Sequence, residues 1–353
     1  MLRPVARTSA LRASLPQAVI DWISNAFDSL QLALYENLVQ PVVFGLGLGN
    51  LLEDAFDATG WLLWGLIQVA VLLLGIRLLE RRWPVEPVTD RAAVRTDVIY
   101  TLIHRLGLVR LALFFTVQPL WDGMAGELRL AGLPTWQLDA LWPGVTDVAW
   151  VSFLLYLVVF DFANYWLHRA QHQFNWWWAL HSLHHSQRQM TMWSDNRVHL
   201  LDDILLGTAF ALLARFIGVE PGQFVAITVI TQLHESLQHA NARISFGRLG
   251  ERLLVSPRFH RLHHSIGVGH ESGGRGTLGG HNFGVLLPVW DMLFRTASFE
   301  NRFDATGVRD QLPEEGGRDY GRGFWRQQWL GLVRLAGALR PRRRDTLSGN
   351  HGT

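Results

Sequence analysis

The chain has 353 residues, of which 49% are hydrophobic and only 18% are charged, with 16 Trp and 19 Phe. This balance is too apolar for an ordinary soluble enzyme and is typical of a helical membrane protein with a polar functional region. The formal net charge is +2, and the basic residues are all arginine. They concentrate near both termini and after the first apolar stretch, which membrane topology explains better than nucleic-acid binding does.

The chain contains no cysteine. This excludes disulfides, cysteine-bound zinc, iron–sulfur clusters and thiol nucleophiles within the chain. A metal would need nitrogen and oxygen ligands, and electrons would have to come from a cofactor or partner that requires no cysteine here. The basic first residues are not followed by a clean signal-peptide core, so we expect no cleaved export signal.

Hydropathy divides the chain into four parts. We expect an amphipathic, interfacial or partial membrane segment over residues 1–60, transmembrane helices over 61–147, a histidine-rich region over 148–300 and a cytosolic tail over 301–353. The fold class that this predicts is an all-α, polytopic membrane protein.

Three stretches are candidate membrane spans. Residues 61–80 match the roughly 20 residues that cross a bilayer, and residues 148–167 form a second convincing span. The stretch 98–120 is a weaker candidate, because it contains His104, Arg105 and Arg110.

Charge asymmetry predicts the orientation of these spans. Five arginines follow the first span within residues 77–97, whereas the loop 121–147 is mainly acidic. The positive-inside rule therefore places 77–97 in the cytoplasm and 121–147 outside. Residues 204–217 and 223–238 are apolar, short for full spans and separated by GVEPG, so they predict a helical hairpin that enters the membrane and returns.

Eight of the fifteen histidines lie in three short segments. They are His168 and His172, then His181, His184 and His185, then His260, His263 and His264. On a helix, offsets of three and four residues place side chains on one face. Each segment can therefore direct its imidazoles at a common point, and the span topology places all three on one side of the membrane.

Neutral imidazole is a good ligand for iron, zinc, copper and nickel. Eight converging histidines exceed the three or four ligands of one zinc, so the pattern predicts two metals. A single histidine on an apolar face is more often a packed residue, and we interpret His104 and His351 in this way.

Two further histidines are candidate ligands. His234 and His239 differ by about 140° around a helix, so both cannot face one centre without a helix break. His239 is favoured because it lies at the helix end nearest the other segments. His199 is as consistent with packing as with a role beside the metal, and His270 and His281 flank a glycine-rich loop.

At these residues the chain resembles the fatty acid hydroxylase/sterol desaturase superfamily of membrane di-iron enzymes. The matching segments are DFANYWLHRAQH (161–172), HSLHHS (181–186), QHAN (238–241), SPRFHRLHHS (256–265) and NFGVLLPVWDMLF (282–294). The resemblance covers roughly residues 150–300. The stretch before NFG is unusually rich in glycine.

The resemblance implies a helical membrane anchor with a cytosolic, histidine-rich helical cap that holds a di-iron site. It also implies an oxidoreductase that uses O2 and two external electrons to hydroxylate, desaturate or cleave a lipid. The implied metal ligands are His168, His172, His181, His184, His185, His260, His263 and His264, together with His239 and His234.

Neighbouring polar residues are candidates to orient these imidazoles. Asp161 lies seven residues before His168 and shares its helix face, although it is equally consistent with a hydrated residue at the membrane edge. Weaker candidates are Asn164, Asp195, Asn196 and Asn282. Trp176, Trp177 and Trp178 are expected to anchor the headgroup region, and Asp291 to brace the fold.

The prediction is an integral membrane, non-haem di-iron oxygenase acting on a fatty acyl, sterol or related lipid, with its site on the cytoplasmic face. Its electron donor would be a separate protein, and the purified protein could carry zinc in place of iron. The alternatives are a dizinc hydrolase, although the HExxH motif is absent, and a non-catalytic membrane protein with a structural metal site. Substrate and oligomeric state are not determined by the sequence.

Overall fold

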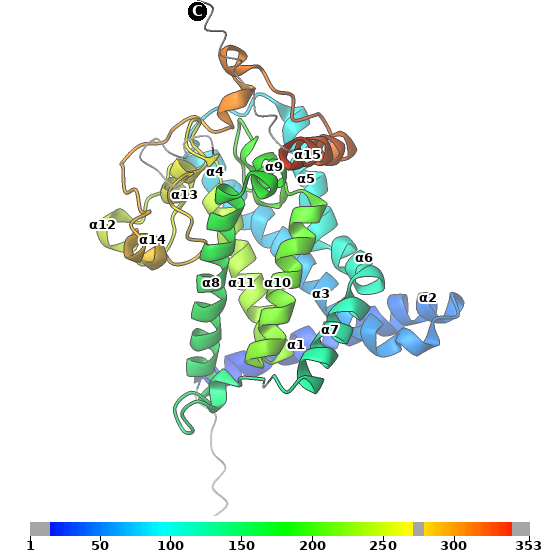
Figure 1. The fold of residues 1–353 in the computed structure, drawn as a ribbon. Coiled ribbons are helices and arrows are strands. Elements are labelled where there is room, and N and C mark those ends of the chain that lie inside the picture. Colours follow the sequence, from blue (N-terminus) through cyan, green and yellow to red (C-terminus); the bar gives the residue numbers. More distant parts are fainter. Residues whose placement is uncertain (1–14, 134, 271–278, 341–353) are drawn as a thin grey trace, which may run out of the picture. The chain divides into compact units, whose positions relative to one another are not determined.

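The computed structural model describes residues 15–133, 135–270 and 279–340 (Figure 1). Within these residues all regular secondary structure is helical, and an isolated antiparallel bridge joins Ser265 to Thr306. The all-α prediction is therefore confirmed for the described part of the chain.

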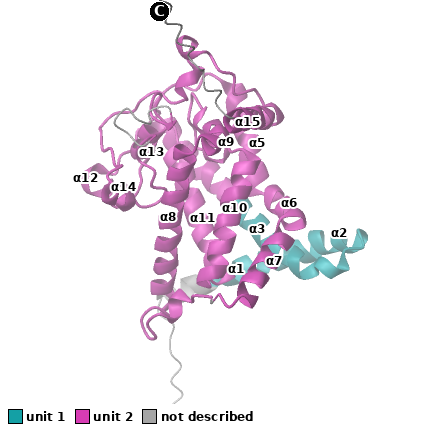
Figure 2. Cartoon of the chain, in the orientation of Figure 1, with its two compact units in different colours: residues 1–66 teal, residues 67–353 magenta. Residues whose placement is uncertain are grey.

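The chain divides into two compact units, residues 1–66 and 67–353 (Figure 2). The first contains α1 (Leu15–Leu34), η1 (Tyr35–Val39), α2 (Gln40–Gly45), η2 (Gly49–Leu51) and the start of α3 (Leu52–Val71). The Gln31 amide donates to the Phe56 carbonyl at 3.0 Å, and the Tyr35 hydroxyl donates to the Leu52 carbonyl at 3.1 Å. These bonds join α1 and η1 to α3.

Within the described residues, two helical segments are long and apolar enough to cross a membrane. The first runs from Gly49 to Arg82 and includes α3, η3 (Leu72–Ile76) and α4 (Arg77–Arg82). The second is α8 (Ala149–Gln173). The first contains the span predicted over 61–80, and the second contains all but the first residue of the span predicted over 148–167.

The weaker candidate span is broken. It forms α5 (Arg91–Arg105) and α6 (Leu108–Thr116), which meet at an angle of 51° and can be counted together as a third span. Gly107 lies between them with a φ of 79°, a conformation that glycine adopts without a steric penalty. Helix α7 (Gln118–Leu130) and η4 (Leu138–Ala140) follow before α8.

The predicted hairpin is present as α10 (Leu200–Ile217) and α11 (Pro221–His239). Gly218 ends α10 in the left-handed conformation, and Pro221 occupies the first turn of α11, where its missing N–H is not needed. The Tyr156 hydroxyl of α8 donates to the Ile217 and Gly218 carbonyls, both at 3.2 Å. Figure 1 shows α8, α10 and α11 side by side.

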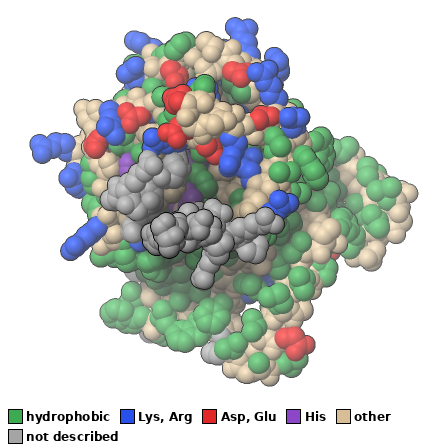
Figure 3. Space-filling view, turned by 45° about the horizontal axis from the view of Figure 1, so that its top comes forward, with side chains coloured by type: hydrophobic (Ala, Val, Ile, Leu, Met, Phe, Trp, Pro, Cys, Tyr) green, Lys and Arg blue, Asp and Glu red, His purple; other side chains and the backbone are tan. Residues whose placement is uncertain are grey.

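A cap of shorter elements covers one end of these helices (Figure 1). It comprises α9 (Asn175–His185), η5 (Ser194–Asn196), α12 (Gly247–Gly250), α13 (Pro257–His263), α14 (Val289–Leu293), η7 (Arg309–Gln311), η8 (Pro313–Glu315) and α15 (Phe324–Leu339). Helix α9 starts directly after α8, so the end of a span leads straight into the cap. In Figure 3 the charged side chains gather on the cap.

Candidate metal centre

Histidines from four helices meet where α8 enters the cap. Two groups of four buried histidines form, and within each group the nitrogens that could bind a metal all lie within 4.8 Å of one another. The first group is His168, His172, His185 and His263. The second group is His184, His239, His260 and His264.

Backbone carbonyls orient three imidazoles of the first group. Nδ1–H of His168 donates to the Phe283 carbonyl (2.9 Å), that of His172 to Gly279 (3.0 Å) and that of His263 to His281 (2.7 Å). Because Nδ1 carries the proton, Nε2 of each ring keeps its lone pair. This is the tautomer that a metal ligand requires.

In the second group, a backbone carbonyl orients the imidazole of His239. Its Nδ1–H donates to the Glu235 carbonyl one turn earlier on α11, at 2.8 Å. Its Nε2 then lies 3.2 Å from Nε2 of His184 and 3.1 Å from Nε2 of His260. Nε2 of His264 lies 3.1 Å from that of His260. Several ring nitrogens therefore converge on one small volume.

The arrangement of the ring nitrogens suits metal binding better than hydrogen bonding between imidazoles. Nε2 of His168 and of His263 is buried without a hydrogen-bond partner in the described residues. An unsatisfied buried acceptor costs about 1–3 kcal/mol, so several within one core would be destabilising unless a cation binds them. The donor set is all nitrogen, which suits iron, zinc, copper and nickel.

Burial also keeps five imidazoles of the cap uncharged. It lowers the pKa of His184, His185, His260, His263 and His264 well below the ordinary value, and neighbouring imidazoles lower it further. Neutral imidazole is the form that binds metal.

His181 lies beside both groups without belonging to either. Its ring centroid is 5.2 Å from those of His168 and His172, and its Nε2 is buried without a partner in the described residues. Its Nδ1 is 3.2 Å from Oδ2 of Asp202, and Oδ1 of the same carboxylate accepts from Gln171 at 2.8 Å. Sequence reasoning missed Asp202, because only the packing of α10 against α9 brings this carboxylate to the histidines.

The remaining predicted residues lie elsewhere. His234 belongs to neither group, in line with its rotation away from His239. His199 begins α10, where its Nδ1 accepts from Leu201 N at 3.1 Å. Nδ1–H of His270 donates to the His172 carbonyl at 2.5 Å.

Asp161 and Asn282 both form hydrogen bonds with the segment 282–298. Asp161 accepts from the amides of Leu286 (2.8 Å) and Leu287 (3.1 Å) and from the Trp290 indole (2.8 Å). Asn282 has a φ of 59° and donates to the Phe259 carbonyl at 2.9 Å. The side-chain contacts described for Asp161 are with Leu286, Leu287 and Trp290, and those for Asn282 are with Phe259 and Ser298; none of these is with an imidazole.

Asp291 connects this loop to the metal centre. It accepts from the amides of Phe283 (2.8 Å) and Gly284 (2.7 Å), and the Phe283 carbonyl orients His168. Burial raises the pKa of Asp291 to about 6. Asp291, which was expected to brace the fold, therefore binds the amide of Phe283, whose carbonyl orients the candidate ligand His168.

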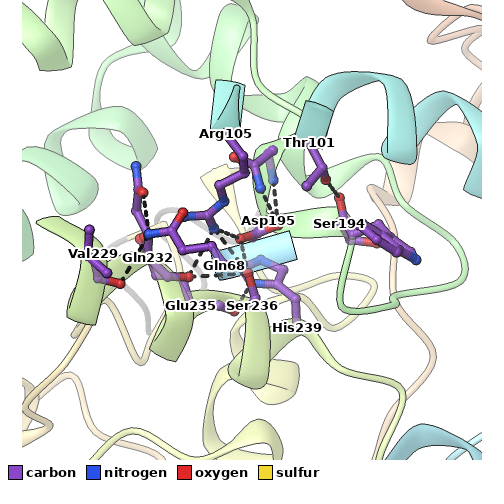
Figure 4. A network of polar contacts seen from close by, with 12 residues as sticks. Gln68, Thr101, Arg105, Ser194, Asp195, Val229, Gln232, Glu235, Ser236 and His239 are labelled. Atoms are coloured by element: carbon purple, nitrogen blue, oxygen red, sulfur yellow. Dashed lines mark hydrogen bonds and ion pairs between the residues drawn. The ribbon is translucent and has the colours of Figure 1, made fainter. Parts of the chain in front are cut away.

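A buried polar network lies beside the second group (Figure 4). Arg105 and Asp195 form an ion pair of 2.7 Å, with side chains only 1% and 6% exposed. The guanidinium also donates to Gln68 and to Ser236, both at 3.0 Å, and Ser236 donates to Asp195 at 2.6 Å. The network joins α3, α5, η5 and α11 three residues before His239.

Spanning helices, a buried histidine centre and a charged cap together define a membrane protein with a candidate two-metal site. Residues 153–296 match the model of the fatty acid hydroxylase family. The resemblance to the fatty acid hydroxylase/sterol desaturase superfamily that the sequence motifs predicted is therefore confirmed over this region. No solved structure matches the chain.

Relatives extend this assignment. An ornithine lipid hydroxylase of Rhizobium tropici is 26% identical over 278 residues, which are 78% of this chain and 79% of the relative. Human alkylglycerol monooxygenase is 30% identical over 155 residues, 44% of this chain and 32% of that protein. A Δ7-sterol 5(6)-desaturase of Gibberella zeae is 26% identical over 128 residues, 35% of this chain and 39% of that protein. These relatives are a lipid hydroxylase, a monooxygenase and a desaturase, and the candidate spans support an integral membrane protein.

Proposed function

We propose that this chain is a membrane non-haem di-iron oxygenase that hydroxylates or desaturates a lipid with O2 and electrons from a separate protein. The observation that carries the proposal is the pair of buried four-histidine groups, in which backbone carbonyls hold Nδ1–H of His168, His172, His263 and His239. Iron bound in both groups would supply oxygen activation and C–H bond oxidation. The relatives' names, which describe hydroxylases, a monooxygenase and desaturases, support the reaction class.

In this proposal the protein binds the two irons, orients the ligand imidazoles and shields the centre from water. His168, His172, His185 and His263 would hold one iron, with His181 beside them, and His184, His239, His260 and His264 the other. His234 is not retained as a ligand. Burial excludes water and keeps the ligands neutral, so that a strongly oxidising centre is separated from bulk solvent.

The apolar helices determine how a substrate would reach the site. α8, α10 and α11 end at the histidines, so an acyl or isoprenoid chain lying among lipids would approach from the membrane side. The relative that matches 78% of this chain is named for hydroxylating ornithine lipid. We therefore favour hydroxylation of a polar acyl lipid over desaturation of a sterol.

The structure supports a cytoplasmic site. Glu80, in the arginine-rich segment, accepts from the amides of Met192 (2.8 Å) and Asn241 (2.9 Å), and Arg243 N donates to the Trp83 carbonyl at 2.7 Å. The arginines that follow the first span therefore lie at the same end as the histidines. The positive-inside rule then places both in the cytoplasm.

Metal analysis tests the proposal. Protein purified in mild detergent from iron-replete cells should contain about two irons per chain, one for each histidine group, with Mössbauer spectra of a coupled pair. Lipids of a host that expresses the protein should gain one oxygen atom, and this product should be absent with His184→Ala. Tightly held zinc with no iron uptake on reconstitution would instead support the dizinc hydrolase or a structural site.

A further inference from the structure

Helix α15 is built with its polar side chains inward and its apolar side chains outward. Gln327, Gln328 and Gly331 are buried, whereas Trp325 is 78% exposed and Trp329 is 64% exposed. Leu332, Val333 and Leu339 are also exposed. A helix facing water shows the opposite pattern.

The inward face is anchored by specific contacts. Gln328 donates to the Tyr100 hydroxyl at 2.9 Å and accepts from Leu200 N at 2.8 Å. Gly331 lies against His199, where an added Cβ would come within 2.2 Å of the ring. The orientation of α15 is therefore fixed, and its exposed tryptophans are not a consequence of loose packing.

The position of α15 corresponds to a membrane boundary. It packs beside α9, which begins where the α8 span ends, and against the residues that begin apolar α10 (Figure 1). Phe174, at the junction of α8 and α9, is 52% exposed. The exposed apolar surface of the span thus continues to the level of α15.

The central and C-terminal part of α15 carries little charge. From residue 327 to 339 the only ionisable residue is Arg334. Its Nε donates to the Ala179 carbonyl at 3.0 Å, and its guanidinium lies over the Tyr320 ring at 4.4 Å. Arg326 precedes and Arg340 follows the uncharged stretch. Tryptophan on an uncharged face with arginine at the ends is typical of helices that lie in the lipid interface.

We propose that α15 is an interfacial membrane anchor, with Trp325, Trp329 and Leu332 inserted among the lipids of the leaflet next to the cap. The occupant of this face is the bilayer itself. The anchor would hold the cap against the membrane surface, and it does not depend on which metal or substrate the centre takes.

The absence of cysteine allows a direct test. Single variants Trp325→Cys, Trp329→Cys and Leu332→Cys would be spin-labelled in the full-length protein, reconstituted in vesicles of phosphatidylethanolamine and phosphatidylglycerol. Accessibility of each label to oxygen, which partitions into lipid, and to a polar nickel chelate would be measured by electron paramagnetic resonance. Leu154→Cys, on the exposed face of α8, is the lipid control, and Glu314→Cys, on exposed η8, is the water control.

We expect the three α15 labels to resemble Leu154→Cys, with an oxygen-to-nickel ratio several-fold above that of Glu314→Cys. Free access of the nickel chelate would overturn the proposal. Protection from both reagents would also overturn it, because it would show that protein, such as a second copy or an electron donor, covers this face. Unchanged metal content in each variant checks that the fold is intact.

Discussion

Asp202 is the carboxylate whose loss should most directly weaken the metal centre. It faces Nδ1 of His181, and the next residue, Asp203, faces His104 at 3.7 Å. Removing a carboxylate that orients a ligand imidazole typically lowers metal affinity by about 10–100-fold. We expect a loss of this size in Asp202→Asn, measured by competition with a chelator, and little change in the control Asp203→Asn. Equal affinities in the two variants would contradict a role for His181 at the metal.

Five buried histidines of the cap, His184, His185, His260, His263 and His264, also predict how stability depends on pH. Their pKa values in the folded state are lowered, while in the unfolded chain they return to about 6.5. Below pH about 6.5 the unfolded state therefore binds more protons, so the stability of metal-free protein should fall as pH falls. Asp291, with its raised pKa, acts in the opposite direction.

Thermal unfolding of metal-free protein in detergent between about pH 8 and pH 5 measures this effect. The metal-loaded protein is the control: its decline should begin at lower pH, because bound ligands cannot be protonated until the metal leaves. A midpoint that rises on acidification would show that carboxylates, and not the histidines, dominate the titration.

At the scale of the elements, the Arg105–Asp195 ion pair helps to position α11, because both side chains also contact Ser236 of α11. Removing one partner of a buried ion pair leaves an uncompensated charge and costs about 3–5 kcal/mol. Arg105→Gln and Asp195→Asn should each destabilise the protein and reduce metal at the second histidine group, through the displacement of His239. The double variant should lose less than the sum of the two, because no charge remains unpaired. Strictly additive losses in unfolding free energy would show that the pair is not coupled.

Sequence reasoning was most successful where the determining interactions are local. Offsets of three and four residues predicted that His168 and His172, or His260 and His264, would share a helix face, and GVEPG predicted the break between α10 and α11. The carbonyls of Phe283 and Gly279 that orient His168 and His172 could not be predicted in this way. They depend on a loop that returns to α8 from more than a hundred residues further along the chain.

The same limit applies to Asp161 and to α15. Helical periodicity placed Asp161 near the face of His168. In the structure its carboxylate oxygens accept from the Trp290 indole and from the amides of Leu286 and Leu287 instead. The sequence between 301 and 353 predicted only a cytosolic tail, because an amphipathic helix with an inward polar face has the same periodicity as one facing water. Only its contacts with Tyr100 and His199 show which face is outward.

At the scale of the whole molecule, the orientation of the cap determines which compartment supplies the electrons. The arginine-rich segment and the histidines lie at one end of α8, and the acidic connection that contains η4 precedes its other end. Single-cysteine variants of the cysteine-free chain test this with a membrane-impermeant maleimide. We expect Leu141→Cys, which is 61% exposed after η4, to be labelled in intact cells, and Glu314→Cys in the cap to be labelled only after lysis. The reverse pattern would place the centre outside the cytoplasm, and a cytoplasmic electron-donor protein could then not reach it.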